Sequence, residues 1–118
     1  MVTSEQITEW HNRIAGYDDP DTDEYIDGLP HDQTDFKCIP ENRRLHSIRD
    51  LCGLMYYADR MKFDGDIISC AEHDQVWLNG PDDAYDGECW PFMYEDVLYL
   101  NRCGIWWDDD VQSFSMWV

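Results

Sequence analysis

The residues with the clearest potential for metal chemistry are three aspartates spaced two residues apart. Asp19, Asp21 and Asp23 match the first three ligand positions of the calcium-binding EF-hand loop. The rest of the loop pattern is missing, because Glu24 occupies the position that needs glycine and Pro30 the position of the bidentate glutamate. We therefore interpret this run as negatively charged surface and expect no bound metal.

Cysteine and histidine offer a second kind of chemistry. The five cysteines contain no CxxC pair, and the closest spacing to a histidine is Cys70-Ala-Glu-His73, whereas structural zinc needs four ligands. A reactive thiolate needs positive potential nearby, which a strongly acidic chain does not supply. We interpret Cys70 as a small core residue and expect no catalytic residue, no cofactor and no enzyme activity. A small cysteine- or metal-dependent enzyme is the alternative.

Charge is the strongest signal in the sequence. The 118 residues include 26 acidic and 8 basic side chains, which gives a formal net charge of -18 at pH 7. Direct binding to nucleic acid needs a basic patch, so that function class is excluded. Aromatic residues make up 14% of the chain, a composition that favours a folded core over disorder. We expect the acids to bind a basic partner, which in turn is expected to be a nucleic-acid-binding protein.

Many of the acids fall into three groups, at 18–27, 82–88 and 108–110. Carboxylates on a rigid surface present negative charge much as phosphates do, and they attract basic surfaces over long range. Trp106 and Trp107 precede the third group on a predicted strand, where neighbours point to opposite faces, so one of them should leave the core side and anchor the partner. The alternative is that both faces of the sheet are covered. The predicted partner-binding residues are Asp18, Asp19, Asp21, Asp23, Glu24, Asp27, Asp82, Asp83, Asp86, Glu88, Trp106, Trp107, Asp108, Asp109 and Asp110.

In length, charge and aromatic content the chain resembles two groups of proteins. One is the phage-encoded inhibitors of host defence that mimic DNA, among them anti-CRISPR and anti-restriction proteins. The other is the acidic immunity proteins that neutralise nuclease toxins. The resemblance covers the whole chain and rests on no motif, so it assigns no residue. It implies a stoichiometric inhibitor of a basic surface.

Two further expectations concern the environment of the protein. The sequence has no apolar run of membrane-spanning length and no pattern typical of a secretion signal, so we expect a cytoplasmic protein, in the host cell if phage-encoded. A reducing compartment also suits an odd number of cysteines. Adaptation to high salt is a competing explanation for the charge, because 19 Asp accompany only 2 Lys.

The elements that must position these residues include two predicted helices in the first half of the chain. Thr3 and Gln6 form a capping pattern and Gly16 a stop, which together predict a helix. A long helix is predicted from Pro40 to about Arg60. Its expected buried stripe consists of Leu45, Ile48, Leu51, Cys52, Met55 and Ala58.

The second half of the chain favours strands. We predict strands at 67–71 and 75–78 around a turn, and at 105–107 and 111–118 around the acidic triplet. The segment 92–103 fits a helix or a strand, and its end signals favour the helix. A short strand is predicted at 36–39, and Trp10, Trp77 and Trp117 are assigned to the core. The prediction is one α+β domain over 1–118, with two or three helices packed on a mostly antiparallel sheet of three to five strands.

A net charge of -18 predicts that salt stabilises the folded protein. Exposed like charges repel one another, and salt screens them over a Debye length of about 10 Å at 0.1 M ionic strength. The melting temperature should therefore rise between low salt and about 0.5 M NaCl in a thermal unfolding series. A flat or falling melting temperature would show that the acids are already paired or well separated.

Overall fold

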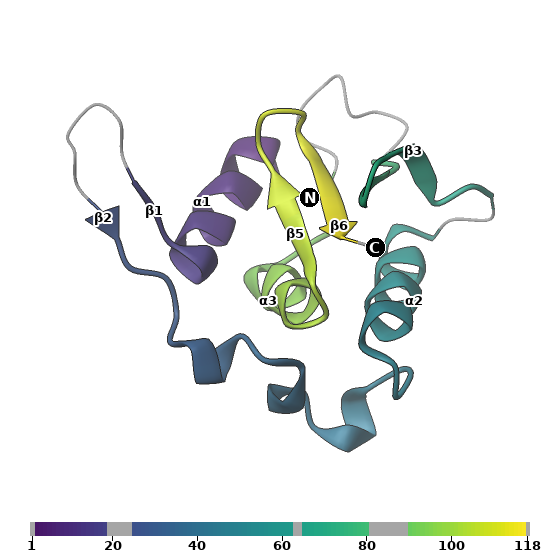
Figure 1. Cartoon of the computed structure of the whole chain (residues 1–118), viewed down its shortest axis with the longest axis horizontal. Helices are drawn as coiled ribbons and strands as arrows, with labels where there is room; N and C mark the ends of the chain where they lie inside the picture. The colour runs from purple at the N-terminus through teal and green to yellow at the C-terminus, as the bar shows by residue number, and fades with distance from the viewer. Residues whose placement is uncertain (1, 19–24, 63–64, 81–89, 118) are drawn as a thin grey trace.

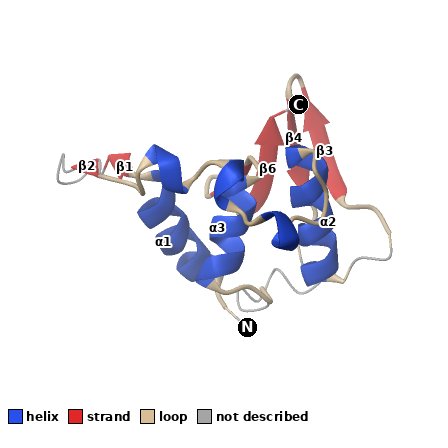
Figure 2. Ribbon diagram, turned by 90° about the horizontal axis from the view of Figure 1, so that it is seen from below, coloured by secondary structure: helices blue, strands red, loops and turns tan. Residues whose placement is uncertain are grey.

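Three α-helices and a four-stranded antiparallel sheet form a single α+β domain, which confirms the predicted fold class. The structure is a computed structural model and describes residues 2–18, 25–62, 65–80 and 90–117. The strands follow the order β3-β4-β6-β5 in the sheet, and α3 packs between α1 and α2 (Figures 1 and 2). The main elements are α1 (Ser4–Ala15), α2 (Arg49–Met61), α3 (Tyr94–Arg102), β3 (Ile68–Glu72), β4 (Gln75–Leu78), β5 (Ile105–Asp108) and β6 (Ser113–Trp117), with a small pair β1 (Tyr17–Asp18) and β2 (Tyr25–Ile26) after α1.

Helix α1 has the ends that the sequence predicts. The backbone N–H of Gln6 donates to the Thr3 hydroxyl at 3.0 Å, which caps the first turn. At the other end Gly16 adopts a positive φ of 82° and its N–H donates to the Asn12 carbonyl.

No helix in the described part of the chain has the length and apolar content that a membrane crossing requires.

The predicted long helix from Pro40 is wrong in its first half. Residues 36–48 hold two 3-10 turns, η2 (Phe36–Cys38) and η3 (Glu41–Arg43), so the strand predicted at 36–39 is wrong too. Local hydrogen bonds replace helical ones here: Arg44 Nε donates to the Ile39 carbonyl at 2.8 Å, and the N–H of Ile48 donates to His46 Nδ1 at 2.9 Å. The regular helix begins only at Arg49.

The predicted buried stripe is only partly confirmed: Cys52 is buried as predicted, but most of the other positions are not. Leu45, Ile48, Leu51 and Met55 are 43% to 55% exposed, whereas the helix buries Cys52, Gly53 and Tyr57. The physical reason lies at Gly53, where an added Cβ would come within 2.8 Å of atoms in Cys103 and Ile105. A residue without a side chain lets the helix approach β5 closely, and this approach fixes which side of α2 faces inward.

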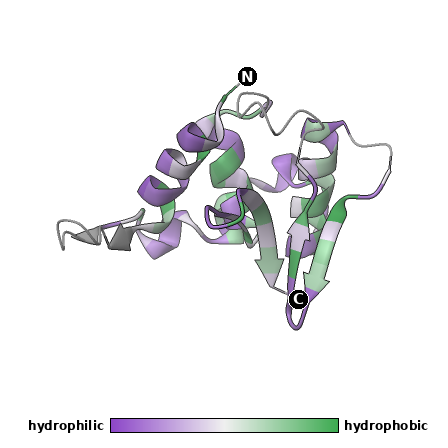
Figure 3. Cartoon of the chain, turned by 90° about the horizontal axis from the view of Figure 1, so that it is seen from above, coloured by the Kyte–Doolittle hydropathy of each residue, from purple (hydrophilic) through white to green (hydrophobic). Residues whose placement is uncertain are grey.

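The predicted hairpins are confirmed. His73, with φ of 55°, and Asp74 form the tight turn between β3 and β4, which is among the hydrophilic parts of the chain in Figure 3. Strands β5 and β6 pair from Ile105 with Met116 to Asp108 with Ser113, around a turn that contains Asp109 and Asp110. The segment 92–103 forms helix α3, as favoured.

Five aromatic rings form the centre of the core. Trp107 lies 5.2 Å from Trp90 and 5.0 Å from Phe114 between ring centroids, mostly edge to face, and Tyr57 and Phe92 complete the cluster. Trp90 is buried, although it follows a stretch rich in acidic residues. Its backbone pairs with Val2 in an isolated β-bridge, which carries Trp90 inward.

A buried carboxylate joins α2 to α3. Asp96 is 2% exposed; it accepts from the backbone N–H of Met93 at 2.8 Å and from the hydroxyl of Tyr56, and it pairs with Arg60 at 3.0 Å. Burial and this carboxylate raise the pKa of Tyr56 to about 12. The same side chain therefore caps α3 and holds two residues of α2.

Replacing Asp96 with Ala should lower the free energy of unfolding by about 2 kcal/mol or more, because three hydrogen-bond donors lose their acceptor. Urea unfolding measures this as a lower midpoint. Glu95→Ala removes an exposed acid from the same turn of α3 and should change the midpoint far less. Equal midpoints for the two variants would contradict the role of Asp96.

Candidate functional site

The sheet has one face toward the helices and one face away from them. Strand pairing places Trp77 of β4, Ser115 of β6 and Trp106 of β5 in one row across the sheet, and Trp117 follows two residues after Ser115 on the same face. The helices contact the other face, through Trp107, Ile105 and Phe114 among others. We call the outward side, defined by Trp77, Trp106 and Trp117, the tryptophan face.

The indoles of this face differ in how they are held. Trp117 is 61% exposed and lies 5.9 Å from Trp106 between ring centroids. Trp77 Nε1 donates to a carboxylate oxygen of Asp108 at 3.3 Å. Between them Gln75 donates to the Ser115 hydroxyl at 2.7 Å.

The structure decides between the members of the predicted tryptophan pair. Trp107 is in the core and Trp106 is partly exposed, as the alternation on a strand predicts. The assignment of Trp117 to the core is wrong, because register with Gln75 places it outward. Trp77 is half-buried on the same outward side.

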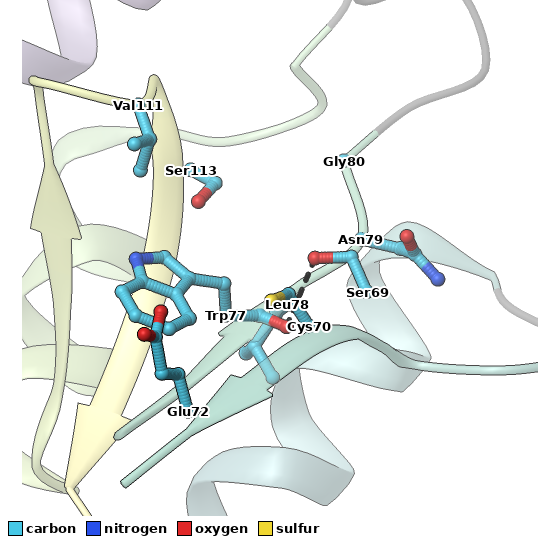
Figure 4. A pocket seen from close by; sticks show the side chains of 9 residues that line it. All are labelled: Ser69, Cys70, Glu72, Trp77, Leu78, Asn79, Gly80, Val111 and Ser113. Atoms are coloured by element: carbon cyan, nitrogen blue, oxygen red, sulfur yellow. Dashed lines mark hydrogen bonds between the residues drawn. The ribbon is translucent and has the colours of Figure 1, made fainter. Parts of the chain in front are cut away.

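Two hollows open on this side of the sheet, and Trp77 lines both. The larger hollow has a volume of about 430 Å³ and is lined from β3, β4 and the start of β6 (Figure 4). The smaller, of about 360 Å³, lies at the β3–β4 turn beside Trp117. Residues lining the larger hollow are Ser69, Cys70, Glu72, Trp77, Leu78, Asn79, Gly80, Val111 and Ser113.

The third acidic group is the one that the structure describes in full. Asp109 and Asp110 are exposed in the β5–β6 turn, and Asp108 is half-buried, with one oxygen on Trp77 and the other accepting from the N–H of Asp110 at 3.1 Å. Asp27 is exposed just after β2, and Asp18 lies in β1, away from the turn. Eight predicted acids lie outside the described residues: Asp19, Asp21, Asp23, Glu24, Asp82, Asp83, Asp86 and Glu88.

Most of the basic residues fall in one part of the chain. Six of the eight basic residues fall between Lys37 and Lys62, on η2, η3, α2 and the segments that adjoin them. The blue 3-10 turns lie at the bottom of Figure 1 and the β5–β6 turn at its top. The acidic β5–β6 turn therefore lies away from the 3-10 turns that carry Lys37 and Arg43.

Two cysteines and a tyrosine form a cluster that sequence reasoning missed. Cys52 of α2 lies 3.2 Å from the hydroxyl of Tyr99, which donates to the Arg43 carbonyl, and Cys103 packs beside them. Burial raises the pKa of the Cys103 thiol; at Cys52 burial acts in the same direction, but hydrogen bonds from Tyr99 and the backbone outweigh it and lower the pKa. Neither residue has exposed surface, so both pack as core residues. Of these three residues, the sequence predicts a buried position for Cys52 alone, from its place in the apolar stripe of the predicted helix.

The prediction that Cys70 is a core residue is wrong. Cys70 lies on strand β3, and its side chain is exposed. His73 is exposed in the adjacent turn. Within the ranges that the structure describes, no three His, Cys, Asp or Glu side chains come together in a group that could hold a metal ion.

Comparison of the chain with protein-family models, with curated proteins and with solved structures finds no match in any of the three. We therefore infer function from the residues and their geometry. The tryptophan face with its acidic turn is the surface that combines exposed aromatic area, hollows and charge.

His11 of α1 lies beside the acidic turn. Burial lowers its pKa from the usual value of 6.5, while the charges of Asp109 and Asp108 act in the opposite direction. Its Nδ1 is buried without a hydrogen-bond partner in the described part of the chain. The folded protein therefore favours the neutral imidazole.

This lowered pKa predicts a pH dependence of stability. Below pH 6.5 the unfolded chain binds a proton at His11 that the folded protein takes up less readily, so the free energy of unfolding should fall as the pH drops from about 7.5 to about 5.5. His11→Gln should reduce this fall, and His31→Gln, which removes an exposed histidine, serves as the control. Urea unfolding at both pH values measures the difference. A fall that is as steep in His11→Gln as in the His31→Gln control would contradict the assignment.

Proposed function

We propose that this chain is a non-enzymatic inhibitor that binds a basic, nucleic-acid-binding surface of another protein and blocks it. The observation that carries this proposal is the placement of exposed acids at both ends of the tryptophan face: Asp74 in the β3–β4 turn, and Asp109 and Asp110 in the β5–β6 turn. An uncovered aromatic surface with a charged rim is typical of a protein interface.

The acids and the tryptophans have different physical roles in this proposal. The net charge of -18 attracts a basic partner over long range and speeds encounter. Trp117, which is 61% exposed, offers a large rigid apolar area that slows dissociation once it is desolvated. Together they give a fast, salt-sensitive and specific association.

The chemistry of the surface supports the proposed target class. A protein that already binds nucleic acid has a cleft of lysines and arginines, where carboxylates can take the places of phosphates. Phage inhibitors of RNA-guided nucleases and of restriction enzymes act in the host cytoplasm on such clefts, and we place this chain in that class. Nuclease toxins have the same kind of cleft and are the alternative target.

The test is competition for nucleic acid. Equimolar protein should abolish DNA or RNA binding by one member of a panel that contains an RNA-guided nuclease, a restriction endonuclease and a nuclease toxin. A triple variant carries Asp74→Asn, Asp109→Asn and Asp110→Asn. It should associate with that target roughly three- to tenfold more slowly at low salt, because steering depends on the summed local charge. Trp117→Ala should raise the dissociation rate about tenfold or more. Surface-binding kinetics at about 0.05 M and about 0.2 M NaCl separate the two effects.

Matched control variants exist on other surfaces of the chain. Replacing Glu5, Glu41 and Glu95 with Gln changes the net charge by the same amount at exposed positions, and Met93→Ala removes an apolar side chain of nearly equal exposure. Inhibition of no panel member by excess protein would overturn the proposal. So would equal rates for the test and control variants, which would favour solubility or salt tolerance as the reason for the charge.

A further inference from the structure

We propose that the larger hollow on the tryptophan face binds an arginine side chain of the partner, with its guanidinium stacked on Trp77 and paired with Glu72. This inference rests on the proposed function, because it names the group on the basic partner that the face recognises. The hollow has a volume of about 430 Å³, within the usual range of about 300–1,000 Å³ for ligand sites, so it can hold a long side chain.

The lining of the hollow favours a cation. Figure 4 shows the Trp77 indole lying across the hollow, with the Glu72 carboxylate on one side and Val111 and Ser113 on the other. The side chain of Glu72 is 67% exposed, and within the described residues its ion-pair contact is with His73, at a long 3.9 Å. All eight lysines and arginines lie in the described ranges and none lines this hollow. A positive group from outside therefore meets an exposed carboxylate and no lysine or arginine already in place.

The indole itself is oriented to receive positive charge. A cation placed over the face of tryptophan is attracted by the negative charge of the ring face. Trp77 is bound at its Nε1 edge to Asp108, 3.3 Å away, so a second carboxylate adds negative potential beside the same ring. The backbone carbonyl of Trp77 is bound by the Ser69 hydroxyl at 3.1 Å, which helps to hold the base of the side chain.

The chain already uses this arrangement internally. Arg60 lies 5.6 Å over the ring of Tyr56 while it pairs with the Asp96 carboxylate at 3.0 Å. The hollow offers the same two groups, an aromatic face and a carboxylate, without the guanidinium. Arginine suits them better than lysine, because its planar group can stack on the ring and still donate to the carboxylate.

Two synthetic peptides test the choice of cation. Binding of hexa-arginine and of hexa-lysine to the full chain is measured by isothermal titration at one salt concentration. Hexa-arginine should bind about fivefold more tightly or better, because stacking adds to charge attraction. Glu72→Gln should weaken hexa-arginine binding about fivefold, and Glu95→Gln, an equal change in net charge on α3, should weaken it less than about twofold.

Trp77→Leu removes the stacking surface and should bring the two peptides to equal affinity. Because Trp77 is half-buried, its replacement can also lower the stability of the fold. A second measurement therefore uses a chain in which no residue of the hollow is changed. Cys70 lines the hollow and is exposed. In a chain with Cys38→Ser and Cys89→Ser, bound hexa-arginine should slow the reaction of Cys70 with a thiol reagent, and hexa-lysine at equal occupancy should slow it less.

The outcomes separate this inference from the proposed function. Equal binding of both peptides, equal effects of the two Glu→Gln variants, or unchanged Cys70 reactivity would overturn the arginine site. The inhibitor proposal would still be decided by competition with the nuclease panel. Arginine-selective binding without inhibition of any panel member would instead support the site and overturn the inhibitor.

Discussion

The burial of Trp107 is the constraint on which the rest of the structure depends. Its ring packs between Trp90 and Phe114, and its Nε1 donates to the Thr8 hydroxyl at 2.8 Å, so one side chain joins the sheet, α1 and the segment before α3. Neighbouring residues on a strand alternate between faces. Fixing Trp107 inward therefore fixes Trp106 and Asp108 outward, and Asp108 in turn binds Trp77. The candidate surface is a geometric consequence of the core.

Local signals in the sequence predicted the elements that local interactions stabilise. The cap at Thr3, the turn at His73-Asp74 and the acidic turn after β5 each depend on residues that are close together in the sequence, and all three are confirmed. The helix predicted over residues 40–48 is wrong because other local interactions oppose it. Side-chain hydrogen bonds from Arg44 and to His46 compete with the helix, and such competition cannot be read from apolar spacing.

The candidate site was only partly predictable because it depends on strand order. The sequence could place Trp106 and Trp107 on opposite faces, since they are adjacent. It could not place Trp77 and Trp117 on the same face as Trp106, because this placement requires the strand order β3-β4-β6-β5 and its register. Likewise, the rotation of α2 follows from the close contact of Gly53 with Ile105, a long-range contact that leaves an apolar stripe outside.

The open edge of the sheet gives the charge a second physical role. Strand β3 lies at the edge and all five of its residues are exposed, so its outer backbone groups resemble a template for a further strand. Next to it lies an aromatic surface that would also favour contact between molecules. Two copies that each carry a charge of -18 repel one another long before these surfaces meet. The acidic composition thus opposes self-association through the sheet edge and the tryptophan face.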